Sequence, residues 1–396
     1  RAAEGLRKAH GEPFNLEGWS RIVDVHNGYL PLIIRAVPEG SVVPCGNALV
    51  TVENTDDQLP WLTSYIETSL LRAVWYPTTV ATVSWNIKKV IKKFLEETCD
   101  DPESVLPFRL HDFGARGVSS AESAEIGGAA HIVNFMGSDT LEGIIAANEH
   151  YQAGVAAFSL PSAEHSTITS WGRANEVDAY RNMLKQFGGP GKLVAVVSDS
   201  YDLDHAVRHI WGKTLKKEVA EMGGTLVVRP DSGDPVEVPV GVVVELLNKF
   251  GSTVNSKGFH VLPPYIRVIQ GDGVNQKSIT AILQKLKDLK IGAENIAFGM
   301  GGALLQQVNR DTDRFAMKAS AIKINGVWKG VQKNPLTDPT KASKAGRLAL
   351  INEGGFSAVA PDGNAWRNEH KEVFVNAALK NQQDYATVRA RAAAAL

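Results

Sequence analysis

Seven short apolar runs between residues 108 and 302 end in charged residues, glycines or both. The polar segments at these ends are His111–Gly117, Gly137–Asp139, Ser159–Ser166, Ser198–Ser200, Arg229–Gly233, Gln270–Gly273 and Gly299–Gly302. Taken alone, each of these segments has the composition of an ordinary turn. Seven in succession predict one shared active site, because the carboxyl ends of the strands in a βα barrel meet on one rim.

The residue types at these ends favour chemistry on a phosphorylated sugar. Three arginines, Arg116, Arg229 and Arg267, together with glycine-rich backbone, suit phosphate groups. Three carboxylates, Asp199, Asp231 and Asp272, suit ribose hydroxyls or a hydrated Mg²⁺ that bridges phosphates.

Several other kinds of site are excluded by their missing motifs. The sequence has no Gly-x-x-x-x-Gly-Lys-Ser/Thr loop, no Gly-x-Gly-x-x-Gly after its first strand and no His/Cys cluster with zinc spacing. Its serines lack a nucleophile-elbow context. We therefore expect neither a dinucleotide cofactor nor a transition metal, and no metal ligand among the side chains can be assigned.

Predicted strands and helices alternate along residues 108–310, and this alternation positions the polar strand ends. It predicts an α/β fold with a TIM-like barrel of seven βα units, although a doubly wound open sheet gives the same local pattern. The predicted strands are 108–113, 131–136, 155–160, 193–198, 225–229, 266–270 and 296–298. The predicted helices are 140–151, 177–187, 201–222 and 278–289.

The segments on either side of this barrel do not show the same alternation of strands and helices. Residues 30–53 predict short antiparallel strands, and 315–331 predict a β-hairpin turning at Asn325-Gly326. We expect residues 1–107 and 311–396 to form a second, β-rich domain beside a barrel of residues 108–310, with a frayed helical tail over 388–396. Residues 87–95 predict an amphipathic helix whose lysines form a solvated face rather than a phosphate or membrane patch.

Composition restricts the partners and the compartment. Lysine and arginine number 42 against 43 acidic residues in 396, so no global charge favours nucleic acid or a membrane surface. The two cysteines, Cys45 and Cys99, form no disulfide framework, and no apolar run approaches the roughly 20 residues that span a bilayer. These features predict a cytoplasmic protein. The first residue is Arg1 rather than Met, so a fragment or a processed chain is expected.

Long motifs in the same order resemble the nicotinamide phosphoribosyltransferase family. They run through nearly the whole chain and comprise 35–40, 51–56, 75–77, 112–120, 163–169, 197–202, 229–233, 268–274, 295–299 and 343–348. The resemblance implies synthesis of nicotinamide mononucleotide from nicotinamide and phosphoribosyl pyrophosphate, with Mg²⁺, with ATP as a co-substrate, and with active sites shared in a homodimer.

The resemblance also implies roles for individual residues. Phe113 would stack on the nicotinamide ring beside Arg116, while Asp139 and Ser159 would bond its carboxamide. His165 is similar to the histidine that ATP phosphorylates. The phosphoribosyl group would contact the remaining candidates, namely Asp199, Arg229, Asp231, Arg267, Ile269, Gly271, Asp272, Gly301 and Gly302, with Arg310 and Lys318 reaching the phosphates from the partner subunit.

Three departures from the family pattern stand out. The family's N-terminal segment, which supplies an aromatic ring from the partner subunit, is expected upstream of Arg1. Ala316 stands where a phosphate-site serine is expected, and the bulkier Met300 follows Gly299 in the glycine loop.

Three alternatives stay open at this point. A nicotinate phosphoribosyltransferase would have the same barrel, but the Asp139 carboxylate would repel the carboxylate of nicotinic acid. A weakly active relative with a binding or signalling role would fit an absent N-terminal segment. An unrelated barrel lyase could use a similar phosphate-binding rim.

Overall fold

The computed structural model describes residues 2–11, 14–338, 341–359 and 368–396, and they form two compact units. One unit comprises residues 1–75 and 310–395, and the other comprises 76–309 with Leu396. The change from one unit to the other therefore lies inside helix α4 (Glu67–Thr98), whereas the sequence-based division placed it at residue 107.

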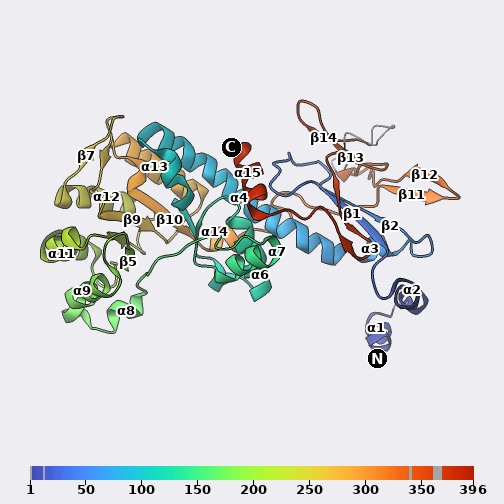
Figure 1. Ribbon diagram of the computed structural model, residues 1–396, viewed down its shortest axis with the longest axis horizontal. Helices are drawn as coiled ribbons and strands as arrows, with labels where there is room; N and C mark the ends of the chain where they lie inside the picture. Colours follow the sequence, from blue (N-terminus) through green and yellow to red (C-terminus); the bar gives the residue numbers. More distant parts are fainter. Residues whose placement is uncertain (1, 12–13, 339–340, 360–367) are drawn as a thin grey trace. The chain divides into compact units, whose positions relative to one another are not determined.

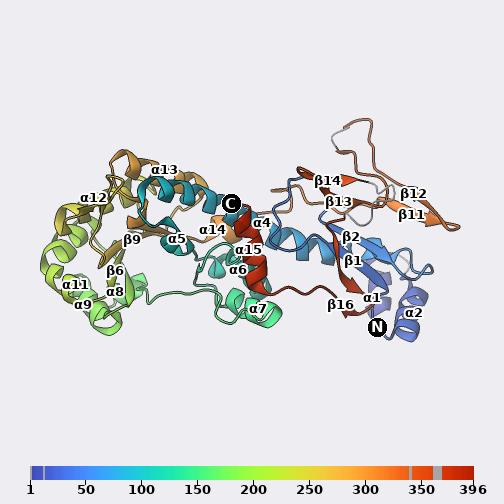
Figure 2. The same cartoon turned by 45° about the horizontal axis from the view of Figure 1, so that its top comes forward.

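A six-stranded parallel sheet organises the second unit. Its strand order is β4-β3-β10-β9-β6-β5, with β3 at Leu110–Asp112, β4 at Gly137–Ser138, β5 at Leu193–Val197, β6 at Thr225–Arg229, β9 at Ile266–Gln270 and β10 at Ile296–Met300. Figures 1 and 2 show helices α9 (Glu176–Phe187), α12 (Glu237–Phe250) and α13 (Gln276–Asp288) on the outer side of these strands. The predicted α/β class and parallel sheet are confirmed.

Two of the seven predicted strands are wrong as drawn. Residues 131–136 contain the end of helix α6 (Ala121–His131) and a turn, and the strand begins only at Gly137. Residues 155–160 form no regular strand. Phe158 makes an isolated bridge to Gly137, and Ser162 makes one to Ala195, so this irregular segment hydrogen-bonds to both edge strands of the sheet. A short apolar run has the same sequence pattern whether it forms a buried strand, a helix end or a buried loop.

The predicted helices are confirmed at α7 (Leu141–Tyr151), α9 and α13, but the helix expected over 201–222 is broken. It consists of α10 (Leu203–His205), the π-helix η4 (Ala206–Thr214) and α11 (Lys216–Glu221). Trp211 in η4 is fully buried, stacks on Tyr180 with ring centroids 4.6 Å apart, and donates a hydrogen bond from Nε1 to Ser198 Oγ at 3.0 Å. The wider π-helical turn thus accommodates an indole anchored at the end of β5.

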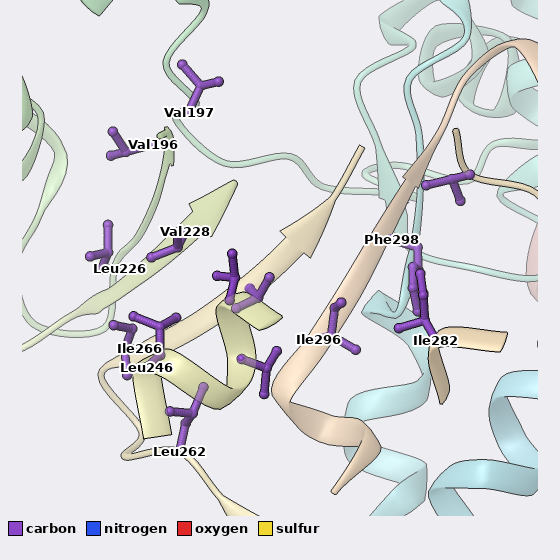
Figure 3. Close-up of a cluster of buried hydrophobic side chains, with 14 of the residues drawn as sticks. Val196, Val197, Leu226, Val228, Leu246, Leu262, Ile266, Ile282, Ile296 and Phe298 are labelled. Atoms are coloured by element: carbon purple, nitrogen blue, oxygen red, sulfur yellow. The ribbon is translucent and has the colours of Figure 1, made fainter. Parts of the chain in front are cut away.

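Side chains alternate between two layers along these strands. Val196, Val228 and Ile296 pack outward against the helices, with Leu246 of α12 and Ile282 of α13 in the same core (Figure 3). The residues between them face the opposite side of the sheet, where Ala195, Val227 and Ile269 cluster with Phe113, Leu160 and Ala297. This period of two decides which strand-end side chains can enter a site on the inner face.

The first unit is rich in antiparallel strands, as expected for residues 30–53 and 315–331. One sheet has the order β16-β15-β1-β2, with β1 at Leu32–Ala36, β2 at Val50–Asn54, β15 at Lys371–Val375 and β16 at Ala378–Leu379. Strands β11 (Ala321–Ile324) and β12 (Val327–Gly330) form the predicted hairpin, with φ of 48° at Asn325 and 80° at Gly326. Strands β13 (Ala349–Asn352) and β14 (Phe356–Val359) form another pair.

The helix expected in the C-terminal tail is confirmed, but it is packed and capped rather than frayed. Residues 385–394 form helix α15 (Tyr385–Ala394), which buries Tyr385, Val388 and Ala392 and is capped by the Asp384 carboxylate. The alanine-rich composition suggested weak packing, but small residues also allow close approach: the Val388 carbonyl lies where a Cβ of Gly40 would stand.

Helix α4 has the predicted amphipathic pattern. Ile87, Ile91 and Phe94 are buried, whereas Lys89 and Lys93 are exposed, which agrees with the solvated lysine face. In the parts of the chain that the structure describes, none of the helices combines the length and the apolarity needed to cross a membrane.

Candidate functional site

The inner face of the parallel sheet holds a pocket at the carboxyl end of its strands. Nine residues line it: His111, Phe113, Asp139, Ser159, Leu160, Ser162, Ala195, Arg229 and Ile269. They come from strands β3, β5, β6 and β9 and from the loops that follow β3, β4 and the bridge at Phe158. Five of them, Phe113, Asp139, Ser159, Arg229 and Ile269, are residues that the sequence singled out.

One wall of the pocket is polar. Ser159 Oγ donates a hydrogen bond to Asp139 Oδ1 at 2.5 Å, and the Asp139 amide donates to the Asp112 carbonyl at 2.9 Å. Asp139 as a whole is exposed, but loss of water around its carboxyl group at the pocket wall raises the pKa of that group above its ordinary value, although the Ser159 hydrogen bond acts in the opposite direction. The pair therefore offers a fixed acceptor and a hydroxyl on one side of a mostly apolar slot.

A buried ion pair stands at the end of β6. Arg229 donates from Nε to Asp231 Oδ1 at 3.2 Å and from Nη2 to Asp231 Oδ2 at 2.7 Å, with side-chain exposures of only 8% and 15%. Burial lowers the pKa of the Arg229 guanidinium, but the Asp231 hydrogen bonds and charge outweigh it, so the net shift is upward. A guanidinium held in this way stays charged and keeps a fixed direction toward the pocket.

A histidine–carboxylate hydrogen bond joins the loop after residue 160 to the end of β5. His165 Nε2 lies 2.9 Å from Asp199 Oδ1, where the histidine is 43% exposed and the aspartate 5%. Because an ionised carboxylate only accepts hydrogen bonds, Nε2 carries the proton and Nδ1 keeps its lone pair. His165 is also the first residue of helix α8 (His165–Thr169).

The strand ends carrying glycines lie close to these pairs. A Cβ on Gly271 would stand 3.1 Å from Asp231 Oδ1, 3.5 Å from the Phe113 ring and 3.6 Å from Arg229 Nε. Gly301 lies equally close to the Phe113 carbonyl, at 3.1 Å for the same hypothetical Cβ. At Gly271 the backbone thus faces the Arg229–Asp231 pair directly. At Gly301 it faces Phe113 directly, because neither glycine has a side chain.

Three further candidates lie exposed around this region. Arg116 is in the short helix η2 (Ala115–Gly117), Asp272 follows β9, and Gly302 begins helix α14 (Gly302–Leu305). Their side chains or backbone are accessible to a ligand, but none of them lines the pocket itself.

Arg267 is not brought together with the other candidates. Its guanidinium donates to the carbonyls of Leu262, Pro263 and Ile266, which precede or begin β9, whereas the pocket lies at the opposite end of that strand. Met300 is 2% exposed in the outer core and faces away from the inner layer, so its bulk does not enter the glycine loop. Both placements follow from position and parity along a strand.

Arg310 and Lys318 belong to the first unit rather than to the unit with the pocket. Arg310 pairs with Asp311 at 2.8 Å, and the Lys318 ammonium donates to the Met317 carbonyl. Ala316 is exposed between them. Their expected contacts with phosphates stay predictions.

Sequence reasoning missed four pocket residues: His111, Leu160, Ser162 and Ala195. His111 is 6% exposed, and burial, reinforced by the charge of Arg109, lowers its pKa to about 4, so the imidazole is neutral at pH 7. The alternation of side chains along a strand could have indicated two of them. His111 precedes Phe113 by two positions and Ala195 precedes Asp199 by four, so alternation predicts the same face of the strand for each pair.

Asp112 is a buried carboxyl directly behind the pocket. It is fully buried, and one of its oxygens accepts a hydrogen bond from the Gly114 amide at 2.7 Å. Burial raises the pKa of Asp112 to about 6. The folded protein therefore binds this proton more tightly than the unfolded chain, so its stability falls as pH rises from about 4 to about 6.

Substitution of Asp112 by asparagine tests this linkage. Asparagine keeps the acceptor for Gly114 and removes the buried charge, so the free energy of unfolding at pH 8 is expected to rise by at most about 3 kcal/mol. The difference should vanish at pH 4, where aspartic acid is neutral in the folded state. Urea denaturation at both pH values measures it, and an equal difference at pH 4 and pH 8 would contradict the buried-charge explanation.

Among the residues described, no group of three or more His, Cys, Asp or Glu side chains could hold a metal ion. Asp199 already accepts a hydrogen bond from His165, and Asp231 is paired with the Arg229 guanidinium.

The chain is similar to known phosphoribosyltransferases. Residues 108–385 match the model of the nicotinate phosphoribosyltransferase (NAPRTase) family. A nicotinamide phosphoribosyltransferase of Xanthomonas campestris pv. campestris is 58% identical over 351 residues, which are 89% of this chain and 75% of that protein. A nicotinamide phosphoribosyltransferase of Acinetobacter baylyi is 33% identical over 390 residues, covering 92% of this chain and 77% of the relative.

Solved structures share the fold at much lower sequence identity. The nicotinate-nucleotide pyrophosphorylase of Pyrococcus furiosus superposes with a TM-score of 0.58 at 15% identity, covering 96% of this chain and 83% of that one. Human nicotinic acid phosphoribosyltransferase superposes with a TM-score of 0.50 at 15% identity, covering all of this chain and 82% of that one. These two likenesses concern the fold alone.

Proposed function

Because the chain belongs to the nicotinate phosphoribosyltransferase family, we propose that it transfers the phosphoribosyl group of phosphoribosyl pyrophosphate to nicotinamide. The products are nicotinamide mononucleotide and pyrophosphate, which places the enzyme in NAD salvage. The observation that carries the choice of base is the pocket in which Phe113, Asp139 and Ser159 meet.

The pocket suits a flat aromatic amide. The Phe113 ring provides a surface for stacking, and Ile269 and Leu160 add apolar walls. The Asp139 carboxylate accepts a hydrogen bond from the carboxamide nitrogen, and Ser159 binds the same group. Nicotinic acid offers a carboxylate at this position, so charge repulsion and the loss of a donor both disfavour it.

The strand ends beside the pocket suit the phosphoribosyl group. Arg229 supplies a fixed, permanently charged guanidinium, and Asp231 and Asp199 supply carboxylates near the sugar. The backbone at Gly271, Asp272, Gly301 and Gly302 binds the ribose and its 5′-phosphate, with Arg116 close to the base. Arg267 has no place in this assignment, because its guanidinium is engaged at the other end of β9.

The reaction requires stabilisation of two opposite charges. As the bond between ribose C1 and the pyrophosphate oxygen breaks, positive charge develops on the sugar and negative charge on the leaving group. Asp231 and Asp199 would stabilise the first charge, and Arg229 would stabilise the second together with the Mg²⁺ that phosphoribosyl pyrophosphate carries. The pyridine nitrogen forms the new bond to C1, and the pocket contributes chiefly by orienting the ring.

We extend the proposal to a homodimer in which Arg310 and Lys318 of one subunit reach the phosphates in the other. Both residues are cationic and exposed, and Lys318 donates a hydrogen bond to the neighbouring Met317 carbonyl. In a mixed dimer, one subunit would carry a substitution at Lys318 and the other an intact pocket. Binding of phosphoribosyl pyrophosphate in that intact pocket would then be weaker.

ATP enters the proposal through His165. With its Nε2–H donated to Asp199, the imidazole presents Nδ1 as the nucleophile toward the γ-phosphorus of ATP. A P–N bond forms, the bond between the β- and γ-phosphates breaks, and ADP leaves. The phosphorylated histidine changes the charge beside the pyrophosphate site and couples ATP hydrolysis to synthesis.

Replacing His165 by alanine is expected to remove the stimulation by ATP. The ratio of the initial rates with and without ATP should fall to about one, because no nucleophile for the γ-phosphate is left at this position. His150→Ala is a matched control, since His150 also pairs with a carboxylate, that of Glu125, at 3.4 Å. Equal stimulation of the His165 variant and the parent would remove ATP coupling from this residue.

Two assays test the main proposal. Incubation with nicotinamide, phosphoribosyl pyrophosphate and Mg²⁺ should give nicotinamide mononucleotide, whereas nicotinic acid should react much more slowly. Faster turnover of nicotinic acid would favour the sister activity that the family model names, nicotinate phosphoribosyltransferase. Binding of both substrates without any product would instead leave a binding role.

A further inference from the structure

Gly299 lies in the middle of the site without an assigned role. It belongs to strand β10 and pairs with His111 of β3. A Cβ built on Gly299 would stand 2.0 Å from Cε2 and 2.3 Å from Cδ2 of the Phe113 ring. Real carbon atoms never approach so closely, so the ring occupies the space that any other residue at 299 would need.

The backbone does not require glycine at this position. Gly299 is absent from the residues with positive φ, and it has a regular parallel partner in β3. Glycine in a strand interior costs stability relative to residues with a side chain. The close approach of the Phe113 ring is therefore the physical reason for glycine here.

The ring is held in this recess from several sides. The Phe113 amide donates to the Met300 carbonyl at 3.0 Å, which fixes the backbone beside β10. Gly271 approaches the ring from β9, with its hypothetical Cβ 3.5 Å from Cε2. Ile269 and Ala297 pack in the same inner cluster. The ring thus occupies the space beside Gly299, and Gly271 lies close to the same ring carbon.

We propose that Gly299 is a specificity-determining position of this enzyme, because it sets the depth of the Phe113 ring and so the width of the slot for the base. With glycine at 299 the ring is recessed and a single flat six-membered heteroaromatic ring fits between it and the wall formed by Asp139 and Ser159. A side chain at 299 pushes the ring out of its recess and into the space that the base must occupy. This inference rests on the proposed function.

The substitution Gly299→Ala tests the inference in the full-length protein. The KM for nicotinamide should rise on the order of 10- to 100-fold, because misplacement of a contact by about 1 Å has effects of that size. The KM for phosphoribosyl pyrophosphate should change less than about twofold, since Arg229 and Asp231 keep their contacts. Gly241→Ala in α12 is the matched control, because its added methyl meets no atom within 4 Å.

A double-mutant cycle distinguishes a contact with the ring from a general disturbance. In a Phe113→Leu background the obstructing ring is absent, so Gly299→Ala should change the KM for nicotinamide less than about twofold. If Gly299→Ala does not fold, recovery of folding in the Gly299→Ala/Phe113→Leu double variant supports the contact. Failure of both variants to fold, or equal effects in the two backgrounds, overturns it.

The proposed function can fail separately from this inference. If the parent protein makes no nicotinamide mononucleotide, the proposed function is wrong whatever Gly299 does. If the parent is active and Gly299→Ala has an unchanged KM for nicotinamide, the function stands and the role of Gly299 is wrong.

Discussion

Replacing Arg229 by alanine is expected to lower kcat/KM for phosphoribosyl pyrophosphate by roughly 100- to 1,000-fold, the usual effect of removing one preorganised charge from a transition state. The guanidinium is held by two hydrogen bonds to Asp231 and its side chain is 8% exposed, so it needs little rearrangement when the substrate binds. Steady-state kinetics with phosphoribosyl pyrophosphate varied at saturating nicotinamide measure the change.

Removing Arg229 also leaves the Asp231 carboxylate without its partner, which destabilises a buried site by several kcal/mol. Arg229→Lys separates the two effects, because it keeps the positive charge and loses the two-pronged geometry. Arg181→Ala is the control for losing such a pair at the surface, since Arg181 Nε bonds both oxygens of Glu218 at 3.1 Å. If both Arg229 variants keep the kcat/KM of the parent, Arg229 does not bind the phosphoribosyl group.

Replacing Asp139 by asparagine is expected to reduce the preference for nicotinamide over nicotinic acid by at least about tenfold. Asparagine removes the negative charge that repels the nicotinate carboxylate and offers it an N–H donor, while its oxygen still accepts from an amide. The readout is the ratio of kcat/KM for the two bases. A ratio equal to that of the parent would place the selectivity elsewhere in the pocket.

The same preference should depend on pH in the parent protein. Burial raises the pKa of Asp139, so the selectivity is fully present above that raised pKa and declines as pH falls through it, because the neutral carboxyl donates to a carboxylate instead of repelling it. The Asp139→Asn variant should show no such dependence. Asp178→Asn is the control, since Asp178 is an exposed carboxylate paired with Arg181 at 2.6 Å.

The sequence by itself predicted the chemistry of the strand ends. The α/β class, the parallel sheet, strands β5, β6 and β9, and the helices α7, α9 and α13 follow from local periodicity. The polar segments after these strands indicated one phosphate-binding rim, and the structure brings Phe113, Asp139, Ser159, Arg229 and Ile269 around one pocket. Strand ends gather in this way because parallel strands share a direction.

The sequence failed where one apolar run can have two structural meanings. Residues 131–136 end a helix, and 155–160 form a loop in which Phe158 alone bridges to β4, yet both contain the residues of a buried strand. Residues 201–222 contain a π-helix, whose register depends on the burial of Trp211 against Tyr180. Packing partners far away in the chain decide such cases, and a local window does not contain them.

Which candidates reach the site was decided only by the tertiary structure. Arg267 and Ile269 are both in β9, but Arg267 is near its amino end and bonds backbone carbonyls there, whereas Ile269 lines the pocket. Met300 and Gly299 are neighbours in sequence, yet one is buried in the outer core and the other touches the Phe113 ring. Composition determines which chemistry a strand end can perform. The direction of the strand and its alternating faces determine which of its residues perform it, because both are set by pairing with other strands.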